Sequence, residues 1–133
     1  MTAKEYLRQA YKMDKRIRIL QGKVDKLRSA LEYHSPSLEG GGGSGSADRM
    51  PDTISKIMEY EQHAAQLQTA YVDKYIEIDR AIHSVEDDTM REVLERRYLL
   101  YQKWEQVADE MHKDIRWIYR LHGRALDCIK IDH

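Results

Sequence analysis

Apolar or small residues recur in alternating steps of three and four along the N-terminal quarter of the chain. The series comprises Ala3, Tyr6, Ala10, Met13, Ile17, Leu20, Val24, Leu27 and Leu31. This spacing keeps one stripe of a helix apolar and is typical of a coiled coil. Thr2 and Glu5 have the spacing of a capping box, which predicts that the helix begins there. A stripe of this length requires a second helix to cover it.

A second seam of the same kind follows a stretch that cannot continue the first helix. Ser35 and Pro36 predict a stop, and the glycine-rich run at 40–46 is typical of a flexible linker, natural or engineered. We therefore expect a loop over residues 35–50 and a second helix that starts near Pro51. Its seam comprises Ile57, Tyr60, Ala64, Leu67, Tyr71, Tyr75, Ile78, Ile82 and Val85.

The two predicted helices carry opposite charge. Residues 1–34 hold nine Lys/Arg and four Asp/Glu, whereas residues 51–86 hold three Lys/Arg and seven Asp/Glu. A basic and an acidic helix joined by a loop favour an antiparallel hairpin over residues 1–86. Because an isolated hairpin buries little apolar surface, we also expect a homodimer through it. The pattern leaves open whether the helices pair within one chain or between two chains.

Residues 87–133 have the pattern of three shorter helices. Asp87 or Asp88 is placed to cap a helix over about 89–100, and shorter helices are predicted over 104–111 and 115–129. The turn at 112–114 and the small residue Ala108 give the last two the spacing of a helix-turn-helix. His112 occupies a turn position at which a positive φ is expected. The predicted fold is all-α, a long coiled-coil-like antiparallel hairpin followed by a three-helix helix-turn-helix segment.

The helix over 115–129 has one apolar and one basic face. At about 100° per residue, Ile118 and Leu121 point inward together with His122, which we expect to be buried and hydrogen-bonded. Arginine can pair with guanine edges or phosphates, so within a helix-turn-helix the outward face is the predicted contact surface for double-stranded DNA; the alternative is a solvated helix face. The candidate residues are Lys113, Arg116, Trp117, Tyr119, Arg120, Gly123 and Arg124. Trp117 has an equally good alternative in packing on the preceding helix, and Trp104 is expected in the core.

The C-terminal part resembles region four of sigma factors. The resemblance rests on the run from Arg91 to Leu99, on 104–108, on Ile118 and on 124–126, and it covers roughly residues 87–129. With the N-terminal run 2–7, the chain is similar to small phage and prophage proteins related to the ArpU and RinA late-gene transcription regulators. The resemblance implies that the long helix fills the DNA major groove, with Arg116, Trp117, Arg120 and Arg124 as contacts, and that the protein controls phage gene expression.

Several classes of function are disfavoured by what the sequence lacks. No Ser-His-Asp arrangement or phosphate-binding loop stands out, so we expect no enzyme activity and no cofactor. The histidines have no paired ligand spacing, so no metal site is expected. Cys128 is the sole cysteine and is predicted as small core filler in a reducing compartment. With no signal peptide or membrane span expected, the bacterial cytoplasm is the predicted location.

The sequence therefore predicts a DNA-binding phage or prophage transcription regulator. The net charge of −1 does not itself indicate a nucleic-acid ligand, so the prediction depends on the local basic face. Two alternatives remain at this stage. One is a DNA-packaging protein similar to small terminase subunits, which also combine helix-turn-helix segments with helical arms. The other is an interaction module that docks on RNA polymerase.

Overall fold

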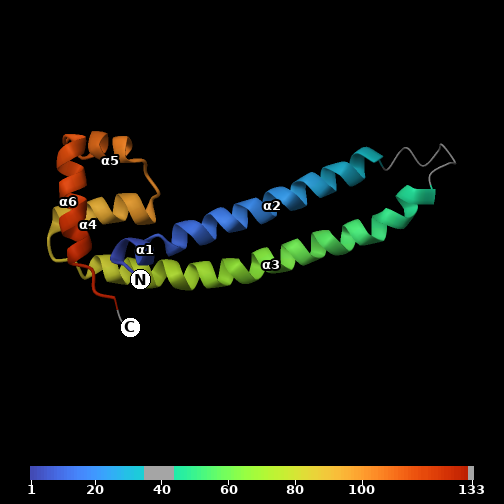
Figure 1. The fold of residues 1–133 in the computed structure, drawn as a ribbon, viewed down its shortest axis with the longest axis horizontal. Helices are drawn as coiled ribbons and strands as arrows, with labels where there is room; N and C mark the ends of the chain where they lie inside the picture. The colour runs from blue at the N-terminus through green and yellow to red at the C-terminus, as the bar shows by residue number, and fades with distance from the viewer. Residues whose placement is uncertain (35–43, 132–133) are drawn as a thin grey trace. The chain divides into compact units, whose positions relative to one another are not determined.

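The computed structural model describes residues 1–34 and 44–131, and every regular element in those ranges is a helix (Figure 1). The elements are α1 (Ala3–Leu7), α2 (Gln9–His34), α3 (Ser44–His83), α4 (Asp88–Leu94), the π-helical turn η2 (Glu95–Leu99), α5 (Trp104–Glu110) and α6 (Ile115–Asp127). The predicted all-α class is confirmed. The capping box is also present, because the Thr2 side chain accepts from the Glu5 amide and the Glu5 side chain accepts from the Thr2 amide.

The chain forms two compact units. The head unit comprises the described residues of 1–13 and 70–133, and the arm unit comprises those of 14–69. Helices α2 and α3 each contribute residues to both units. These units differ from the expected segments 1–86 and 87–133, whose status as domains stays a prediction. The head unit contains the beginning of the first seam and the end of the second, because α1 and the C-terminal part of α3 share its core.

The arm unit consists of the parts of α2 and α3 that carry most of the two seams. Ile17, Leu20 and Val24 on α2 are buried, as are Ile57 and Ala64 on α3. An exposed ion pair joins Arg28 of α2 to Glu61 of α3. The Lys23 Nζ lies 5.3 Å from the centroid of the Tyr60 ring. The arm therefore combines an apolar seam with polar contacts between a basic and an acidic helix.

The start of α3 differs from the sequence expectation. Helix α3 begins at Ser44, so Pro51 lies inside the helix and not in its first turn. The expected loop over 35–50 is thus wrong for 44–50, while 35–43 lies outside the described residues. An internal proline removes one backbone hydrogen bond and strains the preceding turn.

The head unit holds two apolar clusters. The larger includes buried Leu7 of α1, Ile78 and Ile82 of α3, Leu94 of α4 and Ala125 of α6. It therefore joins residues that are more than a hundred positions apart in the chain. The smaller cluster fills the space between α4, α5 and α6; its buried members are Val93, Val107, Ala108, Ile118 and Leu121.

Two local features shape the segment that leads into α5. The Asp87 side chain accepts a hydrogen bond from the Met90 amide at 2.9 Å and caps α4, as one of the two predicted caps. The helix expected over 89–100 is regular only to Leu94, after which η2 widens the turn. Tyr101 then adopts a φ of 57°. Short π segments of this kind occur often near functional sites. Within the described residues, no helix has the length and apolarity that crossing a membrane requires.

Candidate nucleic-acid interface

Helices α5 and α6 are joined by the short turn that the sequence predicts. His112 has a φ of 55°, so the expected positive φ is present on a non-glycine residue. The Lys113 amide donates to the Ala108 carbonyl at 3.0 Å. The Asp114 side chain accepts from the Arg116 amide at 3.0 Å and caps α6. Backbone and side-chain hydrogen bonds thus determine where α5 ends and α6 begins.

One side of α6 is buried and the other is open. Ile118 and Ala125 are both 0% exposed, and Leu121 and His122 are also buried. Six of the seven predicted contact residues are exposed and Trp117 is half-buried; the exposed ones are Lys113, Arg116, Tyr119, Arg120, Gly123 and Arg124. The local periodicity therefore predicted the orientation of α6 correctly.

The exposed arginines of α6 have no acidic partner among the residues that the structure describes. Arg116, Arg120 and Arg124 take part in none of the ion pairs found within the described residues. A methyl group added at Gly123 would have no neighbouring atom within 4 Å, so the surface there is open. Arg116, Arg120 and Arg124 thus form a stripe on α6 whose guanidinium groups are open to external anions.

The aromatic residues around α6 have different roles. Trp117 packs partly against the smaller cluster and lies beneath the Lys113 ammonium, 5.1 Å from the ring centroid. Trp104 is half-buried and contacts the Tyr119 ring edge-on at 5.4 Å. Both tryptophans are therefore part of the packing of the unit.

His122 lies in an aromatic enclosure. Its Nε2 is 2.7 Å from the Tyr98 hydroxyl, and its ring meets that of Trp104 at 4.6 Å between centroids. Burial, with smaller contributions from Lys4 and Arg97, lowers the pKa of His122 to about 4. Burial raises the pKa of Tyr98 to about 12. His122 is thus the buried, hydrogen-bonded histidine expected from the sequence, and it is neutral at pH 7.

Two other sequence expectations concern cysteine and metal binding. Cys128 is exposed, so its assignment as core filler is wrong. It follows α6 directly as the C-cap residue, where the helix ends and the periodicity of its faces no longer applies. In the part of the chain that the structure describes, no cluster of three or more His, Cys, Asp or Glu side chains could hold a metal ion.

The head unit also assembles a group of cations that the sequence analysis did not nominate. Lys4 and Arg8 meet Arg97 and Lys103 around one cavity. The two pairs are separated by about ninety positions along the chain. No local spacing connects them, so only the tertiary fold identifies this group.

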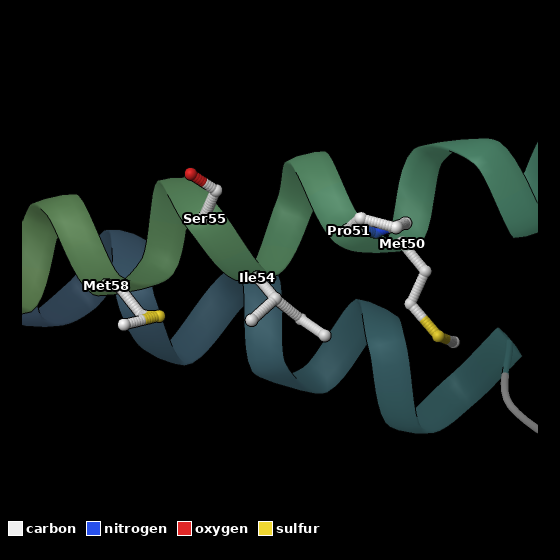
Figure 2. A pocket seen from close by; sticks show the side chains of 5 residues that line it. All are labelled: Met50, Pro51, Ile54, Ser55 and Met58. Carbon is white, nitrogen blue, oxygen red and sulfur yellow. The ribbon is translucent and has the colours of Figure 1, made fainter.

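An exposed apolar patch lies on the arm unit. Figure 2 shows the side chains of Met50, Ile54 and Met58 on one side of α3 and that of Ser55 on the other. Ile54 and Met58 are 45% and 65% exposed, although both are large apolar residues. Exposed apolar patches of this kind often mark contacts with another protein surface.

Comparisons of the chain with protein-family models, with curated proteins and with solved structures found no match. The function therefore has to be argued from the residues and their arrangement.

Proposed function

We propose that the protein binds double-stranded DNA, with α5 and α6 as a helix-turn-helix and the exposed face of α6 in the major groove. The observation that carries the proposal is the stripe of Arg116, Arg120 and Arg124, which is exposed and makes no ion pair within the described residues. Without carboxylate partners among the described residues, these guanidinium groups can form charge-assisted hydrogen bonds with an external anion such as a phosphate.

The dimensions of the stripe suit a DNA groove. Residues four apart lie on one side of a helix, and at about 1.5 Å per residue Arg116 and Arg124 are separated by about 12 Å along the axis. The major groove is about 12 Å wide and admits an α-helix, whose diameter with side chains is about 10–12 Å, so the stripe can run along the groove. Guanidinium groups on such a helix reach either guanine edges, with two hydrogen bonds, or backbone phosphates. Open space at Gly123 permits a close approach of the helix.

A role in transcription regulation follows from the resemblance to region four of sigma factors and to phage late-gene regulators, and it remains part of the proposal. We further propose that the helical hairpin associates into a homodimer that presents two recognition helices. The exposed apolar side chains of Ile54 and Met58 support self-association of the arm. Two-fold symmetric dimers are the commonest soluble homo-oligomers, and a helix-turn-helix dimer can bind two half-sites of DNA.

A salt titration of DNA binding tests the α6 assignment. A labelled duplex of random sequence is titrated with the wild-type chain and with the triple variant Arg116→Ala, Arg120→Ala, Arg124→Ala. If the three arginines contact phosphates, the slope of log affinity against log salt falls by about 2–3 in the variant. Selection of bound DNA from a random pool then identifies the preferred site.

A matched control distinguishes the effect of losing three positive charges on α6 from the effect of losing three positive charges elsewhere on the chain. Lys12, Lys15 and Lys26 are exposed on α2 and take part in none of the ion pairs within the described residues. Their triple alanine variant removes the same charge and should retain near-wild-type binding. Equal losses in both variants, or no loss in the α6 variant, would reject α6 as the DNA-contacting element.

The mass of the protein in solution tests the assembly. A dimer that becomes monomeric in the Ile54→Glu, Met58→Glu variant supports the regulator proposal. A large ring would instead favour the DNA-packaging alternative. Capture of RNA polymerase without any binding of DNA would favour the docking alternative.

A further inference from the structure

The head unit contains a cavity of about 330 Å³ that the proposed DNA interface does not use. It is lined by eight residues, of which four are cationic and four are aromatic. The lining comes from α1 and the turn after it, from the start of α2, from η2, and from the segment that leads into α5. Cavities of roughly 300–1,000 Å³ are the usual size of small-molecule sites.

The cations of this cavity have no acidic partner in the described part of the chain. They are Lys4, Arg8, Arg97 and Lys103, and none is in an ion pair within residues 1–34 and 44–131. The lining itself contains no carboxylate. Like charges that converge without a counter-charge repel one another, so such a cluster favours an anionic ligand.

Arg97 is held in place by two contacts. Its Nη1 donates to the Gln102 carbonyl at 2.9 Å, and its guanidinium lies over the Trp104 ring at 4.6 Å. Lys4, Arg8 and Lys103 are exposed side chains at the rim. The cavity thus has one guanidinium held in place and three exposed cations, which together can surround a group with several charged oxygens.

The positive charges of these cations also affect the pKa values of two buried side chains, His122 and Tyr98. After burial, Lys4 and Arg97 are the next causes that lower the pKa of His122. Arg97 and Arg8 likewise act on the Tyr98 hydroxyl, where they oppose the upward effect of burial on its pKa. These effects agree with a positive electrostatic potential at the cavity, as expected where four cationic side chains converge.

The aromatic side of the cavity is built around Tyr101. This residue holds a φ of 57°, an uncommon conformation for a non-glycine residue and one that tends to occur at functional sites. Its hydroxyl lies 2.7 Å from that of Tyr71, and its ring contacts Tyr11 edge-on at 5.5 Å between centroids. Tyr11 remains 41% exposed, which leaves ring surface for a planar group.

We propose that this cavity binds a nucleotide, with Lys4, Arg8, Arg97 and Lys103 around the phosphate and Tyr11 against the base. Phosphate alone would use the cations but not the aromatic wall, whereas a nucleotide uses both. Stacking of a base on an aromatic side chain and cationic contacts to phosphate are the general means of recognition for such ligands. The same chemistry is offered by a free nucleotide and by the terminal nucleotide of a strand.

Calorimetric titration of the full-length protein tests the proposal. The probes are AMP, ATP, adenosine, pyrophosphate and a short single-stranded oligonucleotide with a 5′-phosphate. We expect AMP or ATP to bind and adenosine to fail, with pyrophosphate weaker than ATP. If the oligonucleotide binds but the free nucleotides do not, and if this binding is lost in the variant Lys4→Gln, Arg8→Gln, the nucleotide recognised is the end of a strand.

The variant Lys4→Gln, Arg8→Gln should weaken binding about tenfold or more, because two charged contacts to phosphate are lost. Both side chains are exposed, and circular dichroism verifies the fold. Lys12→Gln, Lys15→Gln is the matched control and should bind like the wild type. Tyr11→Leu should reduce ATP binding more than pyrophosphate binding. A Kd weaker than about 1 mM for every phosphate compound, or equal binding by the Lys4/Arg8 variant, would overturn the proposal.

Discussion

The buried histidine of the head unit should make the protein sensitive to mild acid. His122 is 8% exposed, and its pKa is lowered from 6.5 to about 4, chiefly by burial. The His122 imidazole therefore becomes protonated at a higher pH in the unfolded chain than in the folded chain. Stability contributed by neutral His122 is fully present above 6.5 and is lost as the pH falls toward about 4.

The magnitude follows from the two pKa values. One pKa unit corresponds to about 1.4 kcal/mol, so neutral His122 contributes about 2 kcal/mol less at pH 5 than at pH 7 and about 3 kcal/mol less at pH 4. The variant His122→Gln removes the titration and retains a polar group for the Tyr98 hydroxyl. At pH 7 it should be less stable than the wild type, because ring contacts with Trp104 are lost.

Urea unfolding of both proteins at several pH values, at one protein concentration, measures the difference. The stability advantage of the wild type should shrink by about 2 kcal/mol between pH 7 and pH 5. His63→Gln, at an exposed position of α3, is the control for replacing a histidine by glutamine. Parallel curves for the wild type and His122→Gln would refute the assignment of a buried, neutral histidine.

Three further substitutions test the packing and the backbone. Ile118→Ala should destabilise the head unit by about 2–5 kcal/mol in urea unfolding, because Ile118 is 0% exposed; a loss below 1 kcal/mol would contradict its place in the core. His112→Gly should stabilise the chain by up to about 1 kcal/mol in thermal unfolding, because glycine accepts the φ of 55° without a steric cost; destabilisation would argue against this turn. Gly22→Ala should raise the stability of α2 by up to about 1 kcal/mol, because an added methyl group meets no atom within 4 Å. A lower Tm for this variant would indicate that another surface covers Gly22.

Features that depend on local periodicity were predictable from the sequence. The seam residues Ile17, Leu20 and Ile57 are buried, and the three arginines of α6 are exposed, as their spacing predicts. The capping residues of α1 and α4 were also predictable, because a cap acts within its own turn. Helical phase and capping are both set by residues that lie within a few positions of one another.

Features that require distant residues were decided by the tertiary structure. Exposure of Cys128 depends on where α6 ends against its neighbours. The cationic cavity exists because folding brings Lys4 and Arg8 against Arg97 and Lys103. The low pKa of His122 depends on its enclosure by Tyr98 and Trp104. Sequence periodicity states which side of a helix is apolar, but it carries no information on which distant side chains that helix will meet.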